Sequence, residues 1–131
     1  MKKMIVSLGL LLVSIPVFAI ECKEDGNQMQ MNRCAYESFE KADKELNKVY
    51  KALVKKKKDN KVYVSNLKKS QRLWIKFRDA ELETIYSCED ENKRICWGSM
   101  YPLLYNSEKA TLTRKRVEEL KEQIKSHEAY L

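Results

Sequence analysis

The chain has 131 residues, of which 26 are lysine or arginine, 19 are acidic and one is histidine, and its net charge is +7. This length is enough for one small domain. With one histidine, three glycines and no HExxH motif, the sequence argues against nucleophile–histidine pairs, phosphate-binding glycine loops and zinc-protease sites.

The first 19 residues are typical of a cleaved bacterial signal peptide. A basic head, MKK, precedes an apolar run that Pro16 ends, and the VFA segment at residues 17–19 has the usual cleavage spacing. The run is short for a membrane span, so an uncleaved anchor is the weaker alternative. We therefore predict a mature domain of residues 20–131 that is periplasmic or secreted and does not insert stably into a membrane.

A first long helix is predicted between about residues 29 and 54. Asn27 and Gln30 have the spacing of a capping box. The four lysines of residues 55–58 suit the negative end of the helix dipole. The apolar residues at helical spacing are Met31, Ala35, Phe39, Ala42, Leu46, Val49, Tyr50 and Leu53.

A second helix, from about residue 61 to Ser87, carries polar residues on its apolar face. Its apolar stripe consists of Leu67, Trp74, Phe77, Leu82 and Ile85. Gln71, Arg78 and Glu81 fall inside the same arc, with Arg78 near its centre. An ionised guanidinium on a buried face needs a partner, or it must line a pocket.

We expect these polar groups to form a structural network in which Arg78 pairs with a carboxylate. A cleft for a ligand or partner is the alternative. The residues assigned to the network are Asp43, Asn47, Tyr50, Gln71, Trp74, Arg78 and Asp79.

Residues 88–102 interrupt the periodicity and predict a disulfide-tied loop at one end of a bundle. Exposed aromatic and methionine side chains favour interface cores, so this loop is the candidate partner-binding site. Its residues are Trp97, Gly98, Ser99, Met100 and Tyr101. In the alternative, Trp97 simply covers the disulfide. A third helix resumes near Leu103, with Leu104, Ala110, Thr113, Val117, Leu120 and Ile124 as its buried stripe.

All four cysteines lie in the predicted exported part, where disulfides persist. Among three connectivities we favour Cys22–Cys34 and Cys88–Cys96, because each pair closes a short loop. A zinc site is the alternative, but the spacings are not CxxC. The sequence thus predicts one all-α domain, a three- to four-helix bundle stapled by two disulfides, without a metal or cofactor.

The net charge of the mature chain excludes further classes of function. Residues 1–19 hold two lysines and no acids, so the mature chain has 24 basic and 19 acidic residues and a net charge of +5. This excess of positive charge is modest for a nucleic-acid-binding protein, so we predict no nucleic acid as a partner. A carboxylate pair for glycoside hydrolysis stays open, but acids in a helical chain usually lie on solvated faces, and we predict no enzyme.

Several segments resemble the LprI-like lysozyme-inhibitor family of small exported bacterial proteins. They are QMQMNRCA at residues 28–35, ADKELN at residues 42–47 with Tyr50, QRLWIKFRDAE at residues 71–81, Gly98-Ser99, and Thr113 with Arg116 and Leu120. The Q-x-x-W-x-x-[FY]-R-D-A pattern is the specific part. Two places where the family often has cysteines hold Leu82 and Glu108 here.

The resemblance implies an exported helical protein that inhibits lysozyme or another peptidoglycan hydrolase by docking on it. A net charge of +5 is unfavourable for docking on a cationic lysozyme unless an acidic local patch makes the contact. The alternative function is an envelope binding or stress module that contacts anionic polymers through lysines such as those of residues 55–58.

Overall fold

The computed structural model describes residues 19–126. The predicted signal peptide, apart from Ala19, lies outside the described residues, as does His127. No helix among the described residues is long and apolar enough to cross a membrane.

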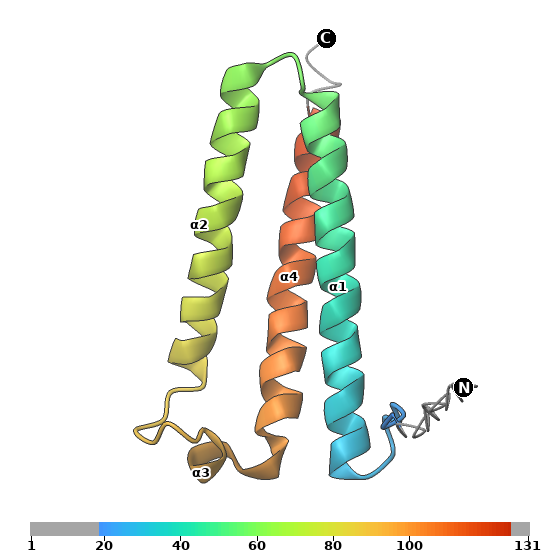
Figure 1. The fold of residues 1–131 in the computed structure, drawn as a ribbon, viewed down its shortest axis with the longest axis vertical. Coiled ribbons are helices and arrows are strands. Elements are labelled where there is room, and N and C mark those ends of the chain that lie inside the picture. The colour runs from blue at the N-terminus through green and yellow to red at the C-terminus, as the bar shows by residue number, and fades with distance from the viewer. Residues whose placement is uncertain (1–18, 127–131) are drawn as a thin grey trace, which may run out of the picture.

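The described chain is all-α, as predicted. Its elements are α1 (Gln28–Lys56), α2 (Lys61–Ile85), α3 (Arg94–Trp97), the short 3-10 helix η1 (Gly98–Met100) and α4 (Tyr101–Ser126). Figure 1 shows α1 and α4 running in the same direction side by side, with α2 antiparallel to both. We call the end at the turn of residues 57–60 the hairpin end.

Local sequence explains where the helices begin. Asn27 accepts from the Gln30 amide at 3.0 Å, and Gln30 returns the bond to the Asn27 amide at 3.0 Å, which confirms the capping box. Asn60 caps α2 by accepting from the Tyr63 amide at 2.9 Å. Such caps contribute about 1 kcal/mol each. The last helix starts at Tyr101, two residues earlier than expected, because a proline in the first turn lacks only an N–H that has no helical partner there.

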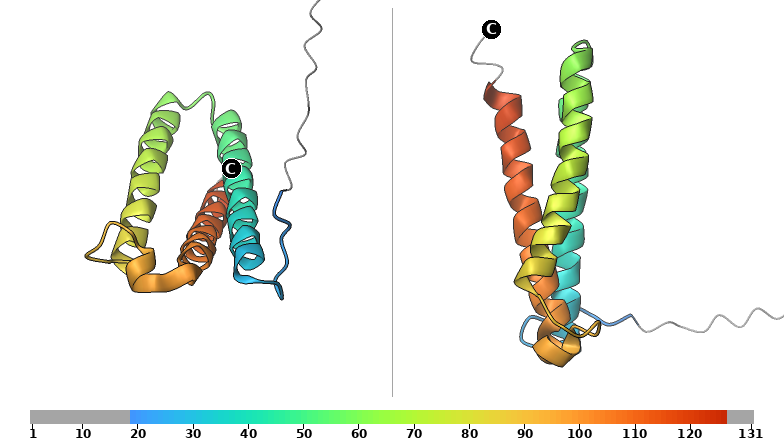
Figure 2. Two further views of the ribbon diagram at one scale, coloured as in Figure 1. Left: turned by 60° about the horizontal axis from the view of Figure 1, so that its bottom comes forward. Right: turned by 90° about the vertical axis from the view of Figure 1, so that its left-hand side faces the viewer.

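Side-chain size sets the spacing of the three long helices. Small residues are buried on the two helices that lie closest: Ala35 and Ala42 on α1, and Ala110 on α4. Small residues let helix backbones approach. By contrast, α2 contributes long side chains and stands farther off, as the left view of Figure 2 also shows. The apolar core fills the space between the helices with Leu46, Val49, Leu53, Leu67, Val117 and Leu120.

Two residues of the predicted stripe on α2 are exposed. Phe77 is 62% exposed and Ile85 is 39% exposed. The side of α2 that is covered is centred on Arg78, and Phe77 is rotated by about 100° from it. Ile85 is the last residue of the helix, where packing ends. The buried positions of α2 are Leu67, Gln71, Arg78 and Leu82.

Both predicted disulfides are confirmed. Cys22 pairs with Cys34, and Cys88 pairs with Cys96, with Cα–Cα separations of 4.7 and 5.9 Å. The first ties the leading segment to α1, and the second closes the loop between α2 and α3. Because α1 and α4 both begin at this end of the bundle, we call it the disulfide end (Figure 1).

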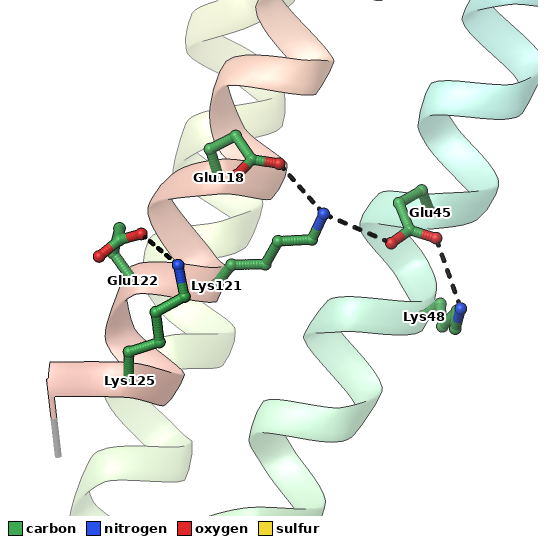
Figure 3. Close-up of polar contacts among 6 residues, drawn as sticks. All are labelled: Glu45, Lys48, Glu118, Lys121, Glu122 and Lys125. Carbon is green, nitrogen blue, oxygen red and sulfur yellow. Dashed lines mark hydrogen bonds and ion pairs between the residues drawn. The ribbon is translucent and has the colours of Figure 1, made fainter. Parts of the chain in front are cut away.

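Several ion pairs lie on the surface of α1 and α4. Lys121 Nζ on α4 lies 3.7 Å from Glu45 Oε1 on α1 and 3.1 Å from Glu118 Oε1 (Figure 3). Of the other pairs drawn there, Lys48–Glu45 lies within α1 and Lys125–Glu122 lies within α4. Exposed pairs of this kind contribute from zero to about 1 kcal/mol, so apolar burial remains the main stabilising term.

Replacing both Cys88 and Cys96 by serine is expected to lower the free energy of unfolding by roughly 2–3 kcal/mol, because the unfolded chain regains the freedom of an eight-residue loop. Urea unfolding followed by circular dichroism measures the loss. The helical content of the folded state should stay the same, and an unchanged midpoint would contradict this role of the disulfide.

Candidate functional site

Arg78 is buried and fully engaged. Its side chain bonds Asp79 Oδ1 through Nε at 2.9 Å and Nη2 at 2.8 Å, and Nη1 donates to Thr113 Oγ1 of α4 at 3.5 Å. Its guanidinium also lies 5.6 Å from the Phe39 ring centroid of α1 and 5.3 Å from that of Trp74. The expected ion pair is present, and Asp79, about half exposed, keeps water on its other side.

A second arginine, Arg116 of α4, extends this arrangement. Its Nε donates to Gln71 Oε1 at 3.1 Å and its Nη2 donates to Ser70 Oγ at 3.1 Å, both on α2. Its guanidinium lies 5.8 Å from the Trp74 ring centroid. Trp74 is therefore within cation–π range of two arginines. We call Phe39, Trp74, Arg78 and Arg116 the arginine spine.

Sequence reasoning quoted Arg116 as part of the family resemblance but did not place it in the network. The signal was present, since Arg116 follows Thr113 by three residues and precedes Leu120 by four, on the buried side of α4. Thr113 is fully buried, as the predicted stripe of this helix requires. Its hydroxyl donates to the Lys109 carbonyl at 2.7 Å and accepts from Arg78.

The predicted α1 side of the network is different. Asn47 Nδ2 donates to the Asp43 carbonyl at 2.9 Å and to Asp43 Oδ2 at 3.2 Å, within the same helix. Tyr50 packs against the apolar core. Among the described residues, no hydrogen bond joins Asp43 or Asn47 to α2. The predicted network therefore does not extend to α2 through hydrogen bonds of Asp43 and Asn47, which bond to each other within α1.

A shallow groove of about 330 Å³ lies between these residues and α2. Its lining residues are Asp43, Leu46, Asn47, Tyr50, Lys68, Gln71, Arg72 and Ile75. The part of the chain that the structure describes has no buried side-chain nitrogen or oxygen without a hydrogen-bond partner. Within residues 19–126 there is also no cluster of His, Cys, Asp or Glu arranged for a metal ion.

The candidate binding loop divides into an inward and an outward part. Trp97 stacks edge-on against Tyr86 with centroids 5.2 Å apart, and its Nε1 donates to the Ser87 carbonyl at 3.3 Å. Tyr101 packs on the same Tyr86 ring at 6.1 Å. Both predicted aromatic anchors thus pack against Tyr86 and hold the loop in place.

One further contact and one backbone conformation fix the outward part. The Ser99 carbonyl accepts from Asn32 Nδ2 of α1 at 3.3 Å. Gly98 has φ 64° and ψ −161°, a conformation essentially restricted to glycine. Gly98, Ser99 and Met100 are exposed, and Met100 retains 46% of its surface.

Ile95, 68% exposed, is a further apolar side chain of this end. Sequence reasoning missed it because an isolated isoleucine among charged residues has no periodic signal. The exposed acids of residues 89–91 lie in the same disulfide loop. The disulfide end therefore exposes Ile95, Met100 and the three acids of residues 89–91, together with Arg94.

Charge is strongly separated along the bundle. Residues 48–76, around the hairpin end, contain eleven lysines and arginines and one acid. Residues 77–113 contain seven acids and four basic residues, and residues 20–47 have the same balance. The net positive charge of the chain therefore does not describe its disulfide end.

Arg78→Ala is expected to lower the free energy of unfolding by about 2–4 kcal/mol, since it removes a side chain packed between two rings and its bonds to Asp79 and Thr113. Thermal and urea unfolding measure the loss. The matched control is Arg72→Ala, an exposed arginine on the same helix, which should change stability by less than about 0.5 kcal/mol. Equal effects of the two variants would contradict a structural role.

Stability is expected to fall at alkaline pH. Burial, the largest cause, raises the pKa of Tyr63, Tyr86, Tyr101 and Tyr105 above the ordinary 10.0, with nearby Asp79 adding to the effect at Tyr105. The folded protein then holds phenol protons that the unfolded chain releases, so this stability is complete below pH 10 and is lost as pH rises through the folded-state pKa values. Urea midpoints at pH 9, 10 and 11 should fall, and less steeply in Tyr105→Phe. A flat profile would contradict this.

Comparison with known sequences shows the family of this chain. The profile described as "Lysozyme inhibitor LprI" matches residues 21–120. A protein of Rhizobium meliloti (strain 1021), described as uncharacterized, is 35% identical over 119 residues, which cover 82% of this chain and 81% of that protein. No solved structure matches significantly. This helical, disulfide-stapled chain belongs to the LprI lysozyme inhibitor family.

Proposed function

We propose that this protein is an exported inhibitor that docks on a lysozyme through its disulfide end. Membership of the LprI lysozyme inhibitor family supports inhibition and a non-catalytic role. The signal-peptide pattern of residues 1–19 supports export to the periplasm or beyond. Docking needs a surface that is both exposed and complementary to the target.

The observation that carries the proposal is the composition of the disulfide end. Ile95 and Met100 offer apolar contact area, and the exposed acids of residues 89–91 lie in the same disulfide loop as Ile95. Apolar anchors with a charged rim are typical of protein–protein interfaces. Because the lysines gather at the hairpin end, the disulfide end can approach a cationic lysozyme in spite of the net charge of the chain.

The loop is also held in one conformation before binding. The Cys88–Cys96 bond, the Trp97–Ser87 hydrogen bond and the Asn32–Ser99 hydrogen bond tie it to α1 and α2. A surface ordered in advance loses less conformational entropy on association, which favours affinity. In this proposal Trp97 and Tyr101 position the loop, while Ile95, Ser99 and Met100 touch the target.

The test is inhibition of peptidoglycan lysis by the mature chain, residues 20–131, measured against several classes of lysozyme. Inhibition of a cationic lysozyme is expected at micromolar protein or below. The double variant Ile95→Arg/Met100→Arg should raise the inhibition constant at least roughly 100-fold, because it places like charge and bulk at the interface core. Val62→Arg, at an equally exposed apolar residue of the hairpin end, is the matched control and should inhibit normally.

The acids can be tested separately. Glu89→Gln/Glu91→Gln should slow association and weaken its dependence on salt, with little change in dissociation. Absence of inhibition across all lysozyme classes at micromolar excess would refute the proposed function. Full inhibition by the Ile95→Arg/Met100→Arg variant would instead place the binding surface elsewhere on the molecule.

A further inference from the structure

The outer face of α2 is an uncovered basic and apolar surface. Only a narrow stripe of this helix, from Leu67 to Leu82, is buried against the other helices. The opposite side is exposed along residues 61–77 and, unlike the disulfide end, takes no part in the proposed lysozyme contact. Among the described residues, no other segment covers it.

Charge on this face has one sign. Residues 60–78 contain no acid. The exposed basic side chains of α2 are Lys61, Lys68, Lys69, Arg72 and Lys76. Four of them, all except Lys68, fall within about 80° of the helix circumference. A shallow groove on α2 is lined by four basic residues, Lys68, Lys69, Arg72 and Lys76, together with Ser65 and Leu73.

Large apolar side chains lie directly beside these cations. Val62 is 71% exposed, Leu73 is 56% exposed and Phe77 is 62% exposed. At 3.6 residues per turn the three fall within about 60° of one another, next to the basic band. A helix face with an apolar band and an adjacent lysine and arginine band is the arrangement found in helices that lie in the membrane interface.

We propose that the outer face of α2 binds the surface of an anionic phospholipid bilayer, with Val62, Leu73 and Phe77 entering the interface and the adjacent cations meeting lipid phosphates. Binding is peripheral, since the other side of the helix stays packed in the bundle. A second copy of this chain would bring two strongly basic faces together, which repel. A soluble anionic polymer would use the cations but leave the three apolar side chains in water.

The experiment is sedimentation of the mature chain with vesicles. Vesicles of phosphatidylglycerol and phosphatidylcholine are compared with vesicles of phosphatidylcholine alone, at low and moderate salt. Binding is expected only to the anionic vesicles and should weaken with salt. Lys69→Gln/Lys76→Gln should weaken it roughly 30-fold. The matched control is Lys44→Gln/Lys115→Gln, which removes two exposed lysines of α1 and α4 and should bind as the parent does.

The contribution of the apolar side chains to vesicle binding is tested with separate variants. Leu73→Ser/Phe77→Ser should weaken vesicle binding at least roughly tenfold at constant charge. Because both side chains are exposed, the thermal midpoint should hardly change, and circular dichroism checks this. In Phe77→Trp, the added tryptophan emission should shift to shorter wavelength when anionic vesicles are present.

Three outcomes would overturn the proposal. One is no binding to anionic vesicles at low salt. Another is loss of vesicle binding in Lys69→Gln/Lys76→Gln while Leu73→Ser/Phe77→Ser binds vesicles and soluble polyphosphate as the parent does. That result would assign the face to a soluble polyanion. The third is a dimer in sedimentation velocity that Leu73→Ser/Phe77→Ser dissociates. Lysozyme inhibition is read from other residues, so failure there leaves this test intact.

Discussion

The spine of two arginines and two aromatic rings is the interaction on which the arrangement of the three long helices depends. Phe39 comes from α1, Trp74 and Arg78 from α2, and Arg116 from α4, so one stack contacts all three helices. Guanidinium groups suit this place because they hydrogen-bond in their plane while their faces pack against rings. The hydrogen bonds from Arg116 to Gln71 and Ser70 then fix the register of α4 on α2.

This spine also gives the bundle its asymmetry. Buried alanines draw α1 and α4 together, whereas the length of the arginine and tryptophan side chains keeps α2 farther away. A helix packed through a narrow stripe leaves much of its surface exposed, which is why α2 carries both part of the core and the large apolar side chains Leu73 and Phe77 on its outside. One packing feature thus supports the fold and creates a free surface.

The two ends of the bundle have opposite character for a related reason. The disulfides, the Tyr86–Trp97 contact and the Asn32–Ser99 hydrogen bond stabilise the end where little apolar core is available. That end is free to carry acids and exposed apolar residues, while lysines gather around the hairpin. The lysines of residues 55–58 and the acids of residues 89–91 are separated by α2, whose 25 residues span roughly 37 Å at a rise of about 1.5 Å per residue. Each end can therefore meet a different kind of partner.

Helix positions, the capping box at Asn27 and both disulfide pairs follow from the sequence, because periodicity, caps and short cysteine loops are local properties. The place of Arg78 on an apolar stripe also predicts that its guanidinium is buried and paired with a carboxylate. Its carboxylate partner Asp79 is among the network residues that the sequence predicts, but the contacts between helices are not. Thr113 and Arg116 lie on another helix, and Asp43 and Asn47 bond to each other instead. Which side of α2 is covered, and whether Trp97 faces inward, were decided only when side-chain size set the helix spacing, since contacts between distant segments depend on the whole packed structure.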